Sequence, residues 1–171
     1  AVTFLNRLSG FRITRWVNTG PATRLMSSGN TYCRPRNAAT NIVPTSTGAA
    51  RAIGMVMPEL AGKLDGLAMR VPVPDGSIVD LAVRLGKNAS RDDINAAVRE
   101  TAAGPMKAVV EYSEAPLVSS DIIGNTHSSI FDALSTNSQG DGYARIVSWY
   151  DNEWGYSNRV VDLIGMLAAY N

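Results

Sequence analysis

Histidine and cysteine each occur once in the 171 residues, as His127 and Cys33. A lone cysteine cannot form a disulfide within the chain, and with a single histidine it cannot complete a zinc site. The sequence also lacks a run of about 18 apolar residues, which excludes a membrane-spanning helix. Because the first residues show no apolar core followed by a cleavage site, we predict no signal peptide and expect a cytoplasmic location.

Acidic residues are absent before Glu59, although the whole chain is nearly neutral, with 16 Lys and Arg against 15 Asp and Glu. The first 58 residues hold seven arginines and so carry a charge of +7, whereas the rest carries −6. Such a basic segment could bind an anionic partner such as nucleic acid, or its arginines could simply face water. We favour exposure to water, because no spaced aromatic side chains or RNA-binding motif accompany the charge.

Hydrophobic residues make up 45% of the chain and charged residues 18%, which is enough to bury a sizeable core. The length suits one domain or slightly more. Residues 1–36 have weak apolar periodicity and several turn-forming pairs, and we assign no helix or strand to them. From Asn37 onward, periodicity, turns and caps agree with one another. We therefore divide the chain into a basic N-terminal segment, residues 1–36, and a domain, residues 37–171.

Two helices are predicted in the first part of this domain. The first begins at Thr47-Gly48 and ends at Pro58. The second begins at Ser90, which is expected to form a capping box with Asp93, and ends at Gly104. Strands are predicted over residues 67–73, 78–85, 108–112 and 145–150.

A last helix follows the strand at residues 145–150, with Asp151 or Asn152 as its cap. Its apolar period predicts four residues that face inward: Val160, Leu163, Ile164 and Leu167. Antiparallel hairpins mixed with helices indicate an α+β fold, not a repeated βαβ unit.

Several familiar catalytic and binding motifs are missing from the sequence. It contains no G-x-G-x-x-G after a strand, no P-loop, no G-x-S-x-G elbow and no metal-ligand cluster. His127 stands beside Ser128 and Ser129, but adjacent residues do not give the geometry of a nucleophile and its base, so we interpret it as structural or exposed. Cys33 is interpreted as an ordinary free thiol, since no predicted helix start holds it.

Three features could carry chemistry. Ser46-Thr47-Gly48 offers hydroxyls and a bare N–H group at a helix start, which suits either a phosphate site or a plain N-cap. Arg70 stands in an otherwise apolar strand and needs a partner, which a substrate phosphate would supply; the alternatives are a salt bridge or a strand position that faces the surface. The aromatic strand-to-helix junction at residues 149–156 could aim Asn152 at a ligand, or could serve packing and capping alone.

These three features lie in segments that resemble the catalytic domain of glyceraldehyde-3-phosphate dehydrogenases. The matching segments are residues 41–50 (NIVPTSTGAA), 58–72 (PELAGKLDGLAMRVP), 77–81 (SIVDL) and 147–157 (VSWYDNEWGYS). They occur in the family's order and spacing, and the resemblance covers roughly residues 36–171. It implies a mixed, largely antiparallel sheet with helices on one face, without the family's Rossmann domain.

The resemblance also implies a reaction and a set of binding residues. The family oxidises glyceraldehyde 3-phosphate with NAD and inorganic phosphate in glycolysis, through a cysteine thiolate and a histidine base. Thr47 and Gly48 match its phosphate-binding Thr-Gly pair, and Arg70 matches its substrate-phosphate arginine. Asn152 matches the asparagine that holds the nicotinamide carboxamide, and Tyr156 matches a tyrosine near that ring. Members of the family form tetramers.

The sequence departs from the family at the catalytic residues. It contains neither the Ser-Cys-Thr-Thr-Asn motif of the nucleophile nor the His-Ala-Tyr-Thr type segment of the base, and Cys33 and His127 fall elsewhere. We therefore assign no catalytic residue and leave enzymatic activity open, as we do the choice between NAD and NADP. A foreign or frame-altered N-terminal segment would explain the abrupt loss of resemblance before residue 36. The alternative function is a non-enzymatic protein that uses this scaffold and its basic segment to bind nucleic acid or another protein.

Overall fold

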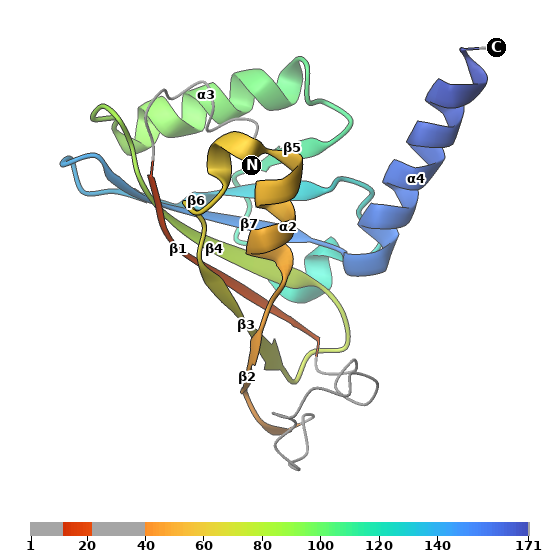
Figure 1. Cartoon of the computed structure of the whole chain (residues 1–171), viewed down its shortest axis with the longest axis horizontal. Helices are drawn as coiled ribbons and strands as arrows, with labels where there is room; N and C mark the ends of the chain where they lie inside the picture. Colours follow the sequence, from red (N-terminus) through yellow and green to blue (C-terminus); the bar gives the residue numbers. More distant parts are fainter. Residues whose placement is uncertain (1–11, 22–39, 171) are drawn as a thin grey trace.

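Seven strands form one mixed sheet in the computed structural model, which describes residues 12–21 and 40–170 (Figure 1). Their order across the sheet is β2-β3-β1-β4-β7-β6-β5. The β1–β3 and β5–β6 pairs are parallel, and the other neighbouring pairs are antiparallel. The strands are β1 (Arg12–Pro21), β2 (Val43–Ser46), β3 (Gly66–Val71), β4 (Ser77–Arg84), β5 (Val110–Ser113), β6 (Ser129–Ser138) and β7 (Tyr143–Tyr150). The predicted α+β class with a mixed, largely antiparallel sheet is confirmed.

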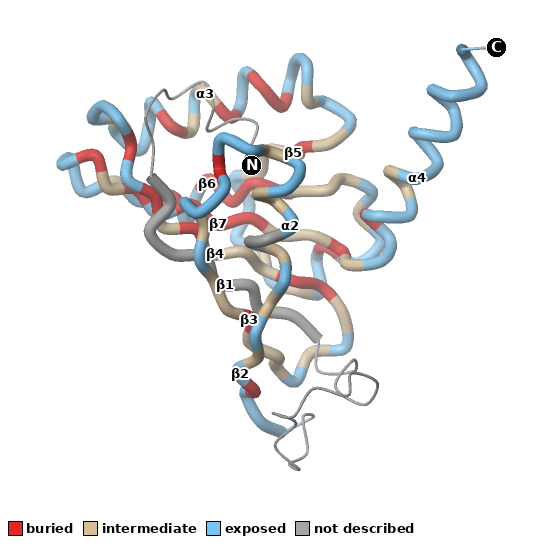
Figure 2. Tube along the Cα trace, viewed as in Figure 1, coloured by how far each residue is buried: buried red, intermediate tan, exposed pale blue. Residues whose placement is uncertain are grey.

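Two helices cover one face of this sheet. Helix α2 (Ala49–Val56) and helix α3 (Arg91–Ala103) both contribute to the same apolar core as the central strands. Figure 2 shows the buried positions along the middle of the sheet and on the inner side of α3. Short 3-10 turns follow α2 and precede β6: η3 (Pro58–Leu60) and η4 (Ser119–Ile122).

The pairing of β4 with β7 forms the centre of the core. It joins eight residue pairs, from Ser77 with Tyr150 to Arg84 with Tyr143. Leu81 and Val83 are 5% and 0% exposed, as the predicted alternation requires. The Arg145 guanidinium donates to both carboxylate oxygens of Asp80 at 2.7 and 2.6 Å, which ties the two strands together and raises the pKa of Arg145.

Helix α3 begins with the predicted capping box. The backbone N–H of Asp93 donates to Ser90 Oγ at 3.1 Å, and the Ser90 N–H and hydroxyl donate to the Asp93 carboxylate at 2.9 and 2.7 Å. The inner side of the helix is buried at Ile94, Val98 and Thr101. Local sequence signals and tertiary packing therefore agree over this helix.

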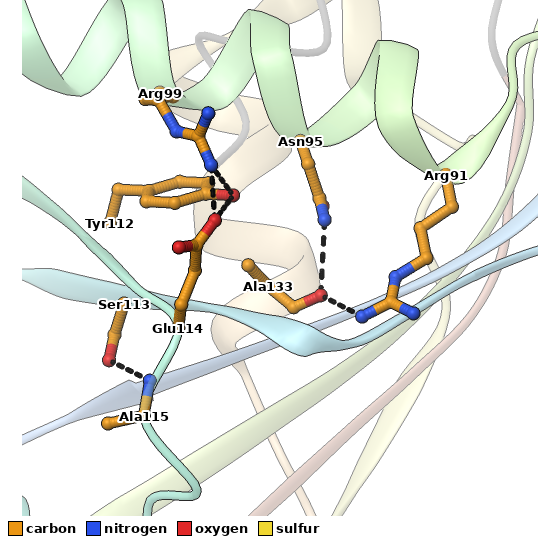
Figure 3. A network of polar contacts seen from close by, with 8 residues as sticks. All are labelled: Arg91, Asn95, Arg99, Tyr112, Ser113, Glu114, Ala115 and Ala133. Carbon is orange, nitrogen blue, oxygen red and sulfur yellow. Dashed lines mark hydrogen bonds and ion pairs between the residues drawn. The ribbon is translucent and has the colours of Figure 1, made fainter.

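Polar contacts tie α3 to the sheet edge below it (Figure 3). Arg91 and Asn95 both donate to the carbonyl oxygen of Ala133, at 3.0 and 3.2 Å. Arg99 stacks on the Tyr112 ring, 4.7 Å from its centroid, and bonds to the Tyr112 hydroxyl and the Glu114 carboxylate. Burial, with the bond to Glu114, raises the pKa of Tyr112. The contacts fix how α3 lies across β5 and β6.

The structure places β1 in a segment to which the sequence analysis assigned no element. β1 lies between β3 and β4, with Trp16 opposite both Gly66 and Leu81. Strand propensity depends on neighbouring strands, so pairing with two distant segments forms a strand that the local pattern does not predict. The rest of the basic segment, including Cys33, lies outside the described residues.

The strand β6 was also missed by the sequence analysis. Its register with β7 shifts between Asp132 and Asn137, which breaks the apolar alternation. Asp132 is 4% exposed, and its carboxylate accepts bonds from the Ser135 N–H and hydroxyl, both at 3.0 Å, and from Trp149 Nε1 at 3.2 Å. The alternation of apolar and polar residues does not predict a buried carboxylate inside a strand. The buried Asp132 is therefore why the sequence did not predict β6.

The predicted inward side of the last helix is wrong. Helix α4 (Asn152–Ala168) leaves the sheet and projects from it (Figure 1), and Leu163, Ile164 and Leu167 are 56%, 61% and 61% exposed. Val160 is 37% exposed. Apolar periodicity predicts a buried face but not which surface buries it. No helix in the described part of the chain combines the length and apolar character needed to cross a bilayer.

Replacing the cap residue of α3 is expected to destabilise the fold. Ser90→Ala removes the acceptor for the Asp93 N–H, and should lower the free energy of unfolding by about 1 kcal/mol in urea denaturation. The Ser90 bonds lower the pKa of Asp93, so their stabilisation is fully present above the unfolded aspartate pKa of about 3.9 and is lost as pH falls through the lower folded value. Asp92→Asn is the control, because Asp92 shares the first turn but not the box. A Ser90→Ala chain as stable as the parent contradicts this account.

The exposed residues of α4 are expected to cause self-association. Ile164→Glu or Leu167→Glu places a charge in the uncharged last part of the helix and should weaken association about tenfold or more, since burying one such side chain contributes about 1.5–3 kcal/mol. Met55→Glu is the control, because Met55 is 74% exposed on α2. Sedimentation velocity measures the effect, and a parent chain that stays monomeric at all concentrations contradicts the prediction.

Candidate functional site

Strand register brings two of the predicted site segments to the same end of the sheet. Met69, Thr19, Ile78 and Trp149 form a row across β3, β1, β4 and β7. Arg70 in β3 and Ser77 in β4 each lie one residue beyond this row, on the same side. Two strand spacings separate them, which is about 10 Å between their backbones. Because Tyr150 pairs with Ser77, helix α4 also begins at this end.

Arg70 occupies the position on β3 that the sequence predicted. It is half-buried and lies opposite Val43 of β2 and Gly20 of β1. Within residues 12–21 and 40–170 the structure gives its guanidinium no hydrogen bond or ion pair. The salt-bridge interpretation therefore has no partner among the described residues, and a charged fork on an apolar strand remains available for an anion.

Thr47 and Gly48 lie at the junction between β2 and α2. Gly48 is the N-cap residue, and Thr47 Oγ1 accepts a bond from the Ala49 N–H at 3.2 Å. That bond uses one acceptor position of the hydroxyl and leaves its O–H able to donate. Thr47 therefore acts as a local cap and still fits an anion contact at the start of α2.

The β2–β3 register separates Thr47 from Arg70. Val43 lies opposite Arg70, so Thr47 stands four residues further along β2, about 13 Å away in the strand direction. The two predicted phosphate contacts therefore start from well-separated points of the backbone.

A cavity of about 460 Å³ opens beside Thr47, between α2 and the start of β3. Its lining residues are Thr47, Gly54, Met55, Ala61, Gly62, Leu64, Asp65 and Gly66. None of these carries a positive charge, and the Asp65 carboxylate accepts from the Gly66 N–H at 2.8 Å. An anion beside Thr47 would therefore depend on the hydroxyl and backbone N–H groups, and not on a side-chain cation from this lining.

Asn152 is the first residue of α4, and its amide is held at both ends. Its Oδ1 accepts a bond from the Ser77 hydroxyl, and its Nδ2 donates to Asp75 Oδ1 at 3.0 Å. Ser77 is 3% exposed, whereas Asn152 and Asp75 are half-buried. The sequence analysis missed Asp75 and Ser77 as site residues, because Asp75-Gly76 resembles any other hairpin turn.

Gly76 fixes the position of this turn. Its φ is +84°, and a Cβ atom there would lie 2.8 Å from the carbonyl oxygen of Ser119. The Gly76 N–H donates to Asp75 Oδ1 at 2.7 Å. The turn is thus packed against η4 without room for a side chain, and Asp75 is set in place by it.

The first residues of α4 carry the rest of the predicted cofactor contact. Tyr156 follows Asn152 by one helical turn, so the two residues share a face, and Tyr156 is 72% exposed. Asp151 does not cap α4 through its side chain, because that carboxylate accepts from the Gly124 N–H at 2.7 Å. The junction therefore presents a half-buried amide and, on the same helix face, the exposed ring of Tyr156, while Trp154 is exposed as well.

His127 has a structural environment, as the sequence analysis expected. Its Nδ1 lies 2.9 Å from Asn125 Oδ1 and 3.2 Å from Glu111 Oε2. The structure gives it no hydrogen bond to Ser128 or Ser129 within the described residues. No group of three or more potential metal ligands occurs in the ranges 12–21 and 40–170.

Comparison with known proteins identifies a matching family model and relatives of this chain. The family model "Glyceraldehyde 3-phosphate dehydrogenase, C-terminal domain" matches residues 12–152, a range that includes β1. A glyceraldehyde-3-phosphate dehydrogenase of Mycolicibacterium smegmatis is 59% identical over 134 residues, 78% of this chain and 39% of that protein. Those of Glossina morsitans morsitans and Schistosoma mansoni are 54% and 51% identical over 145 and 160 residues, covering 85% and 94% of this chain and 42% and 46% of theirs. The chain thus spans less than half the length of these relatives.

The turn at Gly76 is expected to tolerate no side chain. Gly76→Ala adds a Cβ at positive φ and against Ser119, so it should destabilise by more than the roughly 1–2 kcal/mol that the backbone conformation alone costs. Gly62→Ala is the matched control, because Gly62 also has positive φ, +72°, but nothing within 4 Å of a Cβ. Thermal unfolding of both variants measures the difference in stability. Equal losses of stability would show that the backbone at Ser119 moves aside for the added Cβ.

Proposed function

Because the chain belongs to the glyceraldehyde-3-phosphate dehydrogenase family, we propose that it is the C-terminal catalytic-domain part of an NAD-dependent, phosphorylating enzyme of glycolysis. In this proposal the chain supplies contacts to the substrate's phosphate groups and to the nicotinamide. The cysteine and histidine that perform the chemistry in the family have no counterpart motif in this sequence. Oxidation by the isolated chain is therefore not part of the proposal.

The observation that carries the proposal is the state of Arg70. Its guanidinium is half-buried on a β-strand and has no partner among the described residues. It has therefore lost part of its hydration without gaining an opposite charge nearby. A phosphate monoester supplies that charge, and its oxygens match the paired N–H groups of the guanidinium. The substrate that fits is glyceraldehyde 3-phosphate, held by its phosphate at Arg70.

The distance between Arg70 and Thr47 supports a reaction with two phosphate groups. Phosphorylation of the oxidised substrate needs inorganic phosphate at a second position, apart from the substrate's own phosphate. Thr47 and Gly48, about 13 Å along the strand from Arg70, provide hydroxyl and backbone donors for it. Two positions on one sheet fit such a reaction better than one shared site.

Asn152 and Tyr156 fit the nicotinamide of NAD. An amide can bond to the carboxamide group, and an exposed ring on the same helix face can lie against the planar heterocycle. Bound NAD would supply the hydride acceptor. This chain would orient the ring through Asn152.

A tetrameric assembly and a cytoplasmic location belong to the same proposal. The exposed apolar residues of α4 support burial in a larger protein or assembly, and the glycolytic family supports the location. Binding of nucleic acid by the basic segment stays a prediction, since most of its arginines lie outside the described residues.

Substitution of Arg70 tests the proposed phosphate contact. Arg70→Ala is expected to weaken binding of glyceraldehyde 3-phosphate by roughly 1.5–3 kcal/mol, because it removes a charge-assisted pair of bonds. Arg70→Lys keeps the charge but not the paired geometry and should fall between that variant and the parent. Thr47→Ala should cost about 1 kcal/mol of inorganic phosphate binding.

Isothermal titration of the folded variants measures both effects. Arg84→Ala is the matched control, since Arg84 is an exposed arginine on β4, another strand of the same sheet. If Arg70→Ala binds the substrate as tightly as the parent, Arg70 is a structural arginine and the proposed phosphate contact is wrong.

A further inference from the structure

The Asn152 amide can take two orientations that differ by a rotation of 180° about χ2. Its two neighbours, Asp75 and Ser77, differ in whether they favour one of these orientations. In the observed orientation Nδ2 donates to Asp75 at 3.0 Å and Oδ1 accepts from the Ser77 hydroxyl. In the opposite orientation Oδ1 would face the Asp75 carboxylate. Two oxygens that only accept would then stand about 3 Å apart, which is repulsive.

Ser77 does not discriminate between the two orientations. A hydroxyl both donates and accepts, so Ser77 Oγ can bond to either the oxygen or the nitrogen of the amide. An ionised carboxylate only accepts, so Asp75 tolerates nitrogen and rejects oxygen. The acceptor oxygen of Asp75 therefore decides the orientation, although Ser77 is the more deeply buried of the two residues.

The position of Asp75 is itself fixed by backbone contacts. Its Oδ1 accepts from the Gly76 N–H at 2.7 Å, inside a turn that leaves no space for a side chain at Gly76. One residue later, Ser77 is paired with Tyr150 at the end of β7. The carboxylate thus has little freedom to follow a flipped amide, which is the condition for selecting one orientation.

We propose that Asp75 is a positioning residue that fixes the orientation of the Asn152 amide, with Ser77 as a non-selective second contact. The benefit of this role rests on the proposed function. An Asn152 amide of fixed orientation offers its second Nδ2 hydrogen at a constant place, where the carboxamide oxygen of a nicotinamide can accept it. Fixing the donor before binding removes the flipped orientation, which would place Asn152 Oδ1, an acceptor, against that carboxamide oxygen.

Asp75→Ala is the variant that removes the selecting oxygen. Asp75 Oδ1 accepts from both the Gly76 N–H and Asn152 Nδ2, so Asp75→Asn, whose amide oxygen can keep both bonds, is the conservative variant that should retain the orientation. Asp141→Ala is the matched control, because Asp141 Oδ1 accepts from the Tyr143 N–H at 3.0 Å in another turn, near the other end of β4. Ser77→Ala tests the second contact.

The direct readout is the side-chain amide of Asn152 in NMR spectra of the ¹⁵N-labelled full chain, assigned by its loss in Asn152→Ala. In the parent, one Nδ2 hydrogen should be protected from exchange. Asp75→Ala should speed that exchange about fivefold, the equivalent of about 1 kcal/mol, whereas Asp75→Asn, Asp141→Ala and Ser77→Ala should change it less than about twofold. An unprotected amide in the parent overturns the proposal, even if Asp75→Ala should fail to fold, and so does equal protection in the parent and Asp75→Ala.

Titration with nicotinamide mononucleotide, followed in the same spectra, separates this inference from the proposed function. The dissociation constant should rise about fivefold in Asp75→Ala and stay within about twofold in Asp75→Asn and Asp141→Ala. If the parent itself does not bind the nucleotide, the nicotinamide contact under the proposed function is wrong, while amide exchange still decides the role of Asp75. A parent that binds and an Asp75→Ala chain that binds equally well overturn the positioning role.

Discussion

The register between β4 and β7 is the constraint on which the rest of this structure depends. Their eight residue pairs place Leu81 and Val83 in the core, and a shift by one residue would turn those side chains to the opposite face. The same register sets Ser77 opposite Tyr150, directly before α4 begins. A core packing requirement, distant from any ligand, therefore determines where Asn152 stands.

Other contacts of the candidate site follow from sheet order in the same way. Arg70 reaches the end of the sheet occupied by Asn152 because β1 lies between β3 and β4 and is paired with both. Thr47 lies away from that end because β2 runs antiparallel to β3. The separation of Arg70 from Thr47 is thus a property of strand direction, and side-chain substitutions at either residue would leave it in place.

Sequence reasoning succeeded where a local pattern and the tertiary structure require the same residues. The Ser90 capping box and the alternation of β4 are of this kind, since each is defined by residues a few positions apart. It failed for β1, which exists through pairing with two distant strands, and for β6, where the buried Asp132 interrupts the apolar pattern. Among site residues, Arg70 stood out as a charge in an apolar strand, whereas the role of Asp75 depends on a neighbour 77 positions away.

Helix α4 is held by polar contacts in its first half and exposes apolar side chains in its last part. Its first residues are held by polar contacts: Asn152 to Asp75 and Ser77, Asp151 to Gly124, and Arg159 to the carbonyl oxygen of Ala108. Beyond Asp162 the helix has no charged residue, and its apolar side chains are exposed. The contacts that orient Asn152 come from Asp75 in the turn before β4 and from Ser77 at the start of that strand, so the orientation of its amide does not depend on what covers the end of the helix. The proposed cofactor contact and the burial of the end of α4 are therefore separable, and a change at Ile164 or Leu167 should alter association without altering the Asn152 amide.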